Sequence, residues 1–363
     1  MKITGLRTTC VELPIVAPIR TAIHDIRSVG AVLVFLDTDE DATGESYLFS
    51  LSGQRLGILR DMVESFAPLV VGEDPRDPEP LWDKLWRDIN FFGHKGITLF
   101  GISAIDTACW DAAGKAAGRP VVDRLGQVRE RVPVYASGGL WLDAEPAALA
   151  EEAKGFVAAG FRAMKMRIGR RAEDEDVARV AAVRAAIGPD IELMVDANQG
   201  LDRDRAIALG RRLEPLGIAW FEEPVPTYDY EASAAVATAL DVPVASGEME
   251  YTRYGFRDLI GAKAAQILMP DLQRVGGVSE LLRVAQMGQA EGLPVSPHLF
   301  MEYSLMLLGA LPNATYLEHM PWFSPLFRES ITIEDGTIEV PRRPGLGFTF
   351  DPAAIARYRL GGA

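Results

Sequence analysis

Residues 191–224 read IELMVDANQG LDRDRAIALG RRLEPLGIAW FEEP, and the fold class follows from this stretch. Two short apolar runs, Ile191–Val195 and Ile218–Phe221, enclose a segment with helical spacing. Short apolar runs that alternate with helices are typical of buried parallel strands. Asp196 directly follows the first run, and Glu222 directly follows the second. The stretch therefore predicts a β-α-β unit with a carboxylate at the end of each strand.

The same unit recurs in both directions along the chain. Eight apolar runs are strand candidates with helical patterns between them, which favours a parallel sheet. The runs are Val132–Tyr135, Arg162–Met166, Ile191–Val195, Ile218–Phe221, Val242–Ala245, Gln266–Met269, Leu293–Ser296 and Thr315–Leu317, and the helices include 146–159, 174–187, 203–215 and 277–290. Eight such units predict a closed barrel, and a doubly wound open sheet is the alternative.

The chain on either side of the barrel has a different pattern. Strands are predicted at 2–13, 28–38 and 43–49 and helices at 54–70, 79–89 and 97–117. Strands followed by helices without alternation indicate an α+β domain. After residue 326 a hairpin pattern returns around Asp335-Gly336, and we expect this tail to pack on the first domain. The predicted division is a capping domain of residues 1–126 with 327–363, and a barrel of residues 127–326.

The composition excludes several classes of protein. The 363 residues include 37 Lys and Arg against 51 Asp and Glu, which gives a net charge of −14. This excess argues against nucleic-acid binding, because phosphate contacts need clustered basic side chains. Two cysteines are too few for a disulfide framework, and no apolar stretch has the length of a signal peptide or a membrane span. We therefore expect a cytoplasmic protein whose anionic ligand meets a local positive centre.

Polar side chains follow the barrel strands at intervals of about one β-α unit. They are Lys165, Arg167, Asp196, Asn198, Glu222, Glu248, Asp271, His298 and Glu318. In a parallel barrel the carboxyl ends of all strands open on one face, so these side chains are expected to converge. Three carboxylates at close range repel one another unless a cation is present. Their hard oxygen atoms favour Mg²⁺, with Mn²⁺ as the alternative.

The order and spacing of these motifs resemble the mandelate racemase subgroup of the enolase superfamily. The motifs are KMR (165–167), VDAN (195–198), WFEEP (220–224), GE (247–248), MPD (269–271), SPHLF (296–300) and LEH (317–319), with SYLFS (46–50) and AIDTACWDAAGK (104–115) in the first domain. The resemblance implies an α/β fold, a modified TIM barrel of the (β/α)7β type with an N-terminal α+β capping domain completed by the C-terminal tail. It also implies a symmetric homo-oligomer, an octamer.

The resemblance further implies a role for each polar residue. Asp196, Glu222 and Glu248 would bind Mg²⁺, and His298 with Asp271 would form the base dyad. Lys165 would contact the substrate carboxylate, and a protonated Glu318 would donate a hydrogen bond to it. Substrate contacts are implied for Ser137 and Asn198 in the barrel, and for His24 and Tyr47 in capping-domain loops near residues 16–28 and 46–55.

Arg167 departs from the racemase pattern of the resembled subgroup, which has a second lysine at this position as a base. A guanidinium almost never loses its proton, whereas moving a proton between two faces of one carbon needs a base on each face. Dehydration needs one base and an acid. We therefore predict a Mg²⁺-dependent hydro-lyase, an acid-sugar dehydratase that forms a 2-keto-3-deoxy acid, with Arg167 on a distal hydroxyl or second carboxylate of the substrate.

Two other functions remain open from the sequence. A racemase or epimerase of a 2-hydroxy acid would use Arg167 as an unusual second base. A non-catalytic protein would keep the barrel for ligand binding alone. The complete set of predicted metal ligands, base dyad and electrophile argues against the second alternative, because buried charges are costly to keep without a function.

Overall fold

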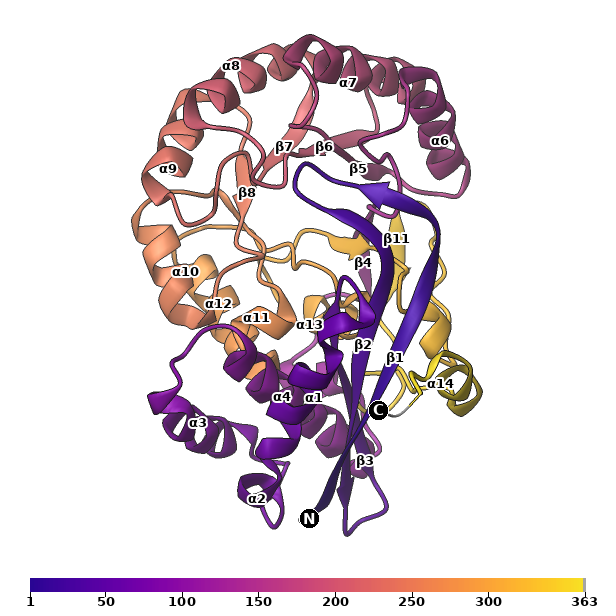
Figure 1. Ribbon diagram of the computed structural model, residues 1–363, viewed down its shortest axis with the longest axis vertical. Coiled ribbons are helices and arrows are strands. Elements are labelled where there is room, and N and C mark those ends of the chain that lie inside the picture. The colour runs from indigo at the N-terminus through magenta and orange to yellow at the C-terminus, as the bar shows by residue number, and fades with distance from the viewer. Residues whose placement is uncertain (362–363) are drawn as a thin grey trace.

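A parallel sheet of short strands runs in chain order through the second half of the molecule (Figure 1). The computed structural model describes residues 1–361. The strands are β4 (Arg131–Ala136), β5 (Ala163–Arg167), β6 (Glu192–Asp196), β7 (Ile218–Glu222), β8 (Val244–Ser246), β9 (Ile267–Leu268) and β10 (Leu317–His319). β10 pairs in parallel with β4, so the first and last strands meet.

The gap between β9 and β10 is closed by the segment that was predicted as the strand Leu293–Ser296. This segment forms only isolated parallel bridges, from Val295 to Leu268 and to Ala314. It contains Pro294 and is followed by Pro297, and neither proline supplies an N–H to a ladder. The closed barrel is confirmed, and the open-sheet alternative is wrong.

Helices surround the barrel as the β-α repeat predicts (Figure 1). They are α6 (Pro146–Ala158), α7 (Glu173–Ile187), α8 (Arg203–Leu213), α9 (Tyr230–Ala239), α10 (Thr252–Gly261), α11 (Leu272–Val275), α12 (Val278–Ala290) and α13 (Met301–Leu308), with a 3₁₀ turn at Glu214–Leu216. β10 leads to a 3₁₀ turn (Ser324–Leu326) rather than to a barrel helix. The barrel is therefore of the (β/α)7β type.

An antiparallel sheet of β1 (Ile3–Arg20), β2 (Asp25–Thr38) and β3 (Thr43–Ser50) forms the capping domain's sheet. The expected loop over residues 16–28 is wrong, because β1 and β2 continue as a hairpin through the pairs Ile19↔Ile26 and Arg20↔Asp25. The register shifts between Pro14 and Ile19. Such an irregularity tolerates Pro14 and Pro18, which cannot donate to a partner strand.

The helices of the capping domain follow the sheet. They are η1 (Gly53–Arg55), α1 (Leu56–Ser65), α2 (Ala67–Val70), α3 (Pro78–Asp88), η2 (Ile89–Phe91), α4 (Ile97–Ala116) and α5 (Val121–Leu125). The single helix predicted over 54–70 is broken at Phe66, since Pro68 has no N–H to continue it. α4 is buried on nearly all sides, between β3 and the barrel segments α11 and α12.

The C-terminal tail contacts both parts of the chain. β11 (Thr337–Glu339) pairs antiparallel with the start of β4. α14 (Pro352–Tyr358) packs against β1, and the Leu360 N–H donates to the Cys10 carbonyl. The tail therefore extends the barrel sheet as well as packing on the capping domain.

Candidate active site

A pocket of about 300 Å³, the site pocket, lies where the carboxyl ends of the barrel strands meet the capping domain. Figure 1 shows the β1–β2 hairpin reaching across this face of the barrel. The lining residues from the barrel are Lys165, Arg167, Asp196, Asn198, Gln199, Glu248, Met249, Arg274, His298, Leu299, Glu318, Met320 and Trp322, and those from the capping domain are Thr21, Ile23, His24, Ile26, Phe49 and Leu51. The volume is at the small end for ligand sites, and a polar lining on one side suits a small hydrophilic ligand.

Lys165 is the positive centre of the site pocket. Its Nζ lies 2.5 Å from Glu222 Oε1, 3.1 Å from Glu318 Oε1 and 3.6 Å from Asp196 Oδ2. Burial lowers the pKa of Lys165, but the negative charges of Glu222 and Glu318 outweigh it and raise the pKa well above its ordinary value. Lys165 is therefore a charged ammonium at physiological pH.

The three predicted metal ligands lie on neighbouring strand ends. Asp196 and Glu222 are paired in register at the ends of β6 and β7, and Glu248 lies in the turn after β8. The Asn198 N–H donates to Asp196 Oδ1 at 2.7 Å, and the Trp220 Nε1–H donates to Glu222 Oε2 at 3.0 Å. Burial raises the pKa of Glu222 to about 8, because repulsion from Asp196 and other carboxylates offsets the attraction of Lys165. Negative charge is thus crowded at this point.

The chemistry of these side chains fits a divalent cation. Two buried oxygens beside them, Asn198 Oδ1 and Glu223 Oε1, have no hydrogen-bond partner. Burial and repulsion from Glu248 and Asp196 raise the pKa of Glu223 well above its ordinary value. A hard cation relieves such repulsion and accepts such oxygens as ligands. Within residues 1–361, however, no three His, Cys, Asp or Glu side chains already stand in a metal-binding arrangement.

His298 is held by carboxylates on both ring nitrogens. Nδ1 lies 2.7 Å from Asp271 Oδ2, and Nε2 lies 3.4 Å from Glu248 Oε2. Burial lowers the pKa of His298, but Glu248 and Asp271 outweigh it and raise the pKa to about 9. Asp271 is itself fixed, because it caps α11 by accepting the Arg274 N–H at 2.9 Å. The structure brings together the two residues of the predicted dyad.

Arg167 lies at the same end of the pocket as Lys165. Its Nη1 donates to the Ser137 carbonyl at 2.7 Å, and its Nη2 donates to Ser137 Oγ at 2.9 Å. The guanidinium lies over the Trp141 ring, 4.4 Å from its centroid. Arg167 Nε is buried without a hydrogen-bond partner, 3.9 Å from Asp196 Oδ2. The side chain is held as a fixed cation with one free donor at the site.

Glu318 accepts hydrogen bonds on both oxygens. Ser137 Oγ donates to Oε1 at 2.6 Å, and the Leu299 N–H donates to Oε2 at 2.8 Å. Although burial raises the pKa of Glu318, Lys165 and His298 outweigh it and hold the pKa well below its usual range. Glu318 is therefore an ionised acceptor in this structure, in contrast to the protonated donor that the family resemblance implied.

The remaining predicted substrate contacts differ in position. Asn198 and His24 line the site pocket, whereas Ser137 lies behind it under Arg167 and Glu318. Tyr47 does not line the pocket and is only 4% exposed. Its hydroxyl donates to Glu302 Oε2 at 3.2 Å, and its ring packs among aromatic residues, so the prediction of direct substrate contact is wrong for Tyr47.

Several lining residues were missed by the sequence reasoning. Arg274, Met249, Met320 and Trp322 line the pocket, and all but Met320 follow the strand ends by three or more residues. Arg274 had one usable signal, because it lies three residues after Asp271 in a helical segment and so about one turn away. The others lie in loops, where sequence periodicity does not predict the direction in which a side chain points.

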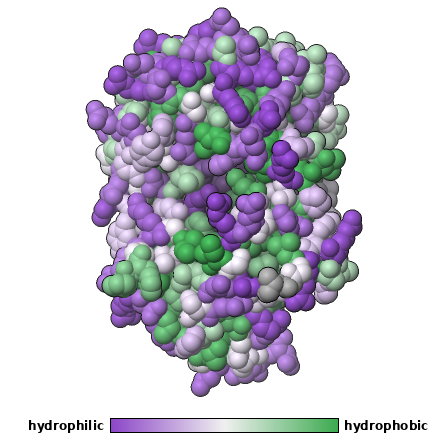
Figure 2. All heavy atoms as spheres, in the orientation of Figure 1, coloured by the Kyte–Doolittle hydropathy of each residue, from purple (hydrophilic) through white to green (hydrophobic). Residues whose placement is uncertain are grey.

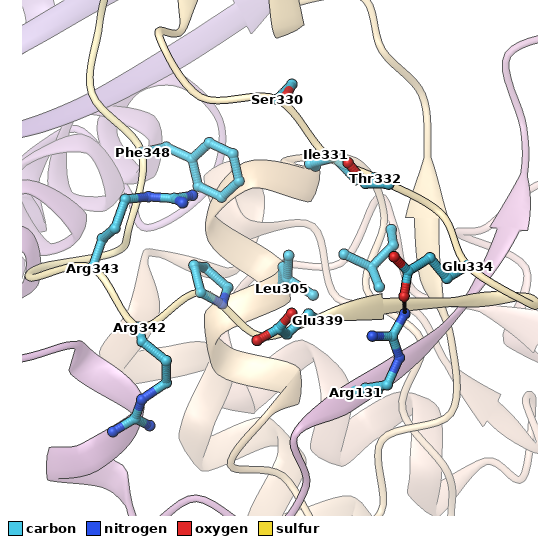
Figure 3. Close-up of a pocket in the computed structure, with 12 residues that line it drawn as sticks. Arg131, Leu305, Ser330, Ile331, Thr332, Glu334, Glu339, Arg342, Arg343 and Phe348 are labelled. Carbon is cyan, nitrogen blue, oxygen red and sulfur yellow. Dashed lines mark ion pairs between the residues drawn. The ribbon is translucent and has the colours of Figure 1, made fainter.

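A second pocket, the tail pocket, lies at the other end of β4 (Figure 3). It has a volume of about 440 Å³ and is lined by Arg131, Arg342 and Arg343 among residues of the tail. Arg131 pairs with Glu334 at 3.0 Å, as the dashed line in Figure 3 shows, and Arg342 pairs with Asp123 at 2.7 Å. Arg131 and Arg342 are thus already in ion pairs, and Arg343 donates to the Gly347 carbonyl at 2.6 Å, so the tail pocket has no convergent chemistry. The face of the molecule seen in Figure 2 is mostly hydrophilic, with apolar side chains in small groups.

The fold and the strand-end carboxylates define a class of barrel enzymes with a capping domain, and comparison with known proteins agrees. Residues 3–126 match the family model for the mandelate racemase / muconate lactonizing enzyme N-terminal domain. Residues 148–354 match the model for the enolase C-terminal domain-like family. The chain belongs to the mandelate racemase/muconate lactonizing enzyme family of the enolase superfamily.

Three relatives illustrate the range of reactions in similar proteins. Arabinonate dehydratase of Saccharolobus solfataricus is 36% identical over 80% of this chain and 81% of its own length. L-talarate/galactarate dehydratase of Salmonella typhimurium is 34% identical over 97% and 91%. D-galactarolactone cycloisomerase of Agrobacterium fabrum is 34% identical over 99% of both chains.

The Salmonella typhimurium dehydratase also has a solved structure, liganded with Mg and L-lyxarohydroxamate. It superposes with a TM-score of 0.94 at 32% identity and covers 99% of this chain and 93% of that chain.

Among residues 1–361, no helix is both long and apolar enough to cross a bilayer.

Proposed function

We propose that this chain is a Mg²⁺-dependent acid-sugar dehydratase, a hydro-lyase that converts a polyhydroxy acid to a 2-keto-3-deoxy acid. The observation that carries the proposal is the asymmetry of the site. His298 is a titratable group anchored by Asp271, whereas the second base position holds Arg167, and a guanidinium is a poor base. Two of the relatives described above are named acid-sugar dehydratases, which supports the same reaction class.

Asp196, Glu222 and Glu248 would hold Mg²⁺, which when bound supplies positive charge to the substrate carboxylate. Lys165 would neutralise the same carboxylate, because its ammonium lies among the acidic residues at this end of the site pocket. Arg167 would add a second fixed positive charge at this end of the pocket. Fixed charges of this kind stabilise the enediolate that forms when the neighbouring carbon loses its proton.

His298 would remove the α-proton through Nε2, since Nδ1 is occupied by Asp271. The imidazolium that results is stabilised by Asp271, as in other His–Asp pairs. It would then give that proton to the departing β-hydroxyl, so that water leaves and the enol product tautomerises to the keto acid. One residue thus serves as base and then as acid, and no base is required at Arg167.

The test is an assay of aldonic and aldaric acids with Mg²⁺, measuring keto acid and, in D₂O, exchange of the α-proton. We expect keto acid with at least one acid and loss of activity when Mg²⁺ is chelated. A Glu222→Gln variant should need far more Mg²⁺ or be inactive. Racemised 2-hydroxy acid without keto product would refute the dehydratase and favour the racemase or epimerase.

The division into residues 1–126 with 327–363 and 127–326, the cytoplasmic location and the symmetric octamer stay predictions. Light scattering of the purified chain tests the oligomeric state directly.

A further inference from the structure

Arg274 lies in the wall between two cavities. It lines the site pocket and also an adjoining cavity of about 340 Å³, the side pocket. Phe49 and Leu51 line both as well, and the side pocket continues along Arg55, Ile58 and Phe100 of the capping domain. Arg274 therefore lies where a ligand too long for the site pocket would extend into the side pocket.

The guanidinium of Arg274 is incompletely satisfied by the protein. Its Nη1 lies 3.1 Å from Asp271 Oδ2, yet this buried nitrogen has no hydrogen-bond partner. The side chain is 16% exposed, and the Phe49 ring centroid lies 6.0 Å from its central carbon. Nη1 itself is buried against Asp271, so a ligand in the pocket meets the exposed part of the guanidinium, where an anionic oxygen gains a charge-assisted hydrogen bond.

The cations of the site pocket come from opposite sides of the barrel, because β5, which carries Lys165 and Arg167, lies four strands from β9, which leads to Arg274. Lys165 and Arg167 are both within 4 Å of Asp196 Oδ2. Arg274 instead contacts Asp271, the carboxylate that binds Nδ1 of His298. Because Ser137 fixes Arg167 beside Lys165, the distal group that the sequence assigned to Arg167 falls to Arg274.

We propose that Arg274 binds the second carboxylate of the substrate, so that the preferred substrate is a polyhydroxy diacid, an aldaric acid. The inference rests on the proposed dehydratase function, in which Lys165 marks the end where the reacting carboxylate binds. With a monoacid the guanidinium of Arg274 keeps its ion pair with Asp271 but gains no ligand acceptor, whereas a diacid supplies a second, charge-assisted one. Sites that hydrogen-bond a substrate group discriminate strongly against analogues that lack it.

A purely positioning role for Arg274 predicts a different result. If Arg274 only steadied Asp271, its loss would lower kcat for every substrate and would not separate diacids from monoacids. The comparison therefore uses matched pairs, such as galactarate with galactonate and glucarate with gluconate.

The experiment measures kcat and KM for each pair with the wild type, Arg274→Met and Arg274→Lys. We expect Arg274→Met to raise KM for the diacid by about 10–100-fold, the effect of one charge-assisted hydrogen bond, with a far smaller change for the monoacid. Arg274→Lys should keep part of the preference, because it keeps the charge. Arg257→Met, which removes an exposed arginine that lines neither pocket, should change neither KM.

Calorimetric binding of the diacid with Mg²⁺ present separates the two proposals. Diacid binding that weakens in Arg274→Met, without keto acid from any substrate, would refute the dehydratase and keep the role of Arg274. Equal losses for diacid and monoacid, or a wild type that prefers the monoacid, would refute the role of Arg274. If Arg274→Met does not fold, wild-type constants that are equal for the diacid and the monoacid refute it.

Discussion

His298 shows how much chemistry one residue acquires from its neighbours. An isolated imidazole has a pKa near neutrality, but here Glu248 and Asp271 overcome burial and raise the pKa of His298 to about 9. Binding of a cation by Glu248 would neutralise one of these two carboxylates and so lower the pKa of His298 again. The base strength of His298 is therefore coupled to the occupancy of the adjacent site.

Replacement of His298 tests this assignment at the residue scale. We expect His298→Asn to lower kcat by at least about 10²–10⁴-fold, the usual contribution of a general base. Mg²⁺ binding, followed by calorimetry, should stay close to that of the wild type, because His298 is not among the three carboxylate ligands. The control is His94→Asn, in which the lost ring stacks on Trp86 and does not line the site pocket. Retained turnover in His298→Asn would move the base role to Lys165 or Arg167.

At the scale of elements, the β1–β2 hairpin forms the roof of the site pocket. Its turn is closed by Thr21, whose N–H donates to the His24 carbonyl at 2.9 Å. Thr21 Oγ1 accepts the N–H groups of Ile23 and His24, at 3.4 and 3.1 Å. Since Ile23 and His24 line the pocket, the geometry of this turn sets the shape of the substrate cavity.

Loosening the turn should therefore affect binding more than chemistry. Thr21→Val keeps the shape of the side chain but removes the oxygen that accepts two N–H groups. We expect KM to rise about 3–10-fold, since each lost hydrogen bond costs about 1 kcal/mol, while kcat changes less. Thr8→Val is the matched control, because Thr8 lies on β1, the strand that leads into this turn, and its hydroxyl donates to Glu64, remote from the pocket. A fall in kcat with constant KM would contradict this role for the hairpin.

At the scale of the whole molecule, the capping domain and the barrel share buried hydrogen bonds near the predicted catalytic residues. Ser103 Oγ of α4 donates to the Leu272 carbonyl at 2.7 Å, next to Asp271. Asp106 of the same helix accepts from the N–H and the hydroxyl of Ser279 at 2.9 and 2.6 Å. The capping domain thus supports the segment that carries the dyad as well as covering the pocket.

The burial of Asp106 gives the stability of the whole molecule a pH dependence. Burial raises the pKa of Asp106 to about 7, although hydrogen bonds from Ser279 act in the opposite direction. The folded chain therefore holds a proton that the unfolded chain releases above about pH 4. The stabilisation is fully present below pH 4 and is lost as the pH rises through 7.

We expect the free energy of unfolding to fall between pH 5 and 8, and to fall less in Asp106→Asn. Between pH 5 and 8 the free energy of unfolding should fall by roughly 1–3 kcal/mol less in Asp106→Asn than in the wild type, as measured by denaturant unfolding. Asp61→Asn, at an exposed carboxylate of α1, is the control and should keep the wild-type slope. Identical slopes in Asp106→Asn and the wild type would show that Asp106 is not the group responsible.

Much of the barrel and of its polar strand ends followed from the sequence, because both depend on local rules. A buried parallel strand must be apolar along its length, and the first polar residue after it marks its carboxyl end. Asp196, Glu222 and His298 were therefore located at one face of the barrel before any contact was known. The predicted strand ends are accurate where the runs are continuous and less so where proline interrupts them, as at Pro294 and Pro297.

Other features depended on contacts between residues far apart in the chain, which only the tertiary structure decided. Tyr47 is turned away from the pocket by Glu302, which is 255 residues away, and Glu318 is kept ionised by Lys165 and His298. The direction of Arg274 depends on Asp271 and on the capping domain around Phe49. Local periodicity places a residue on a strand or helix, but its charge state and its partners are set by the groups that packing brings against it.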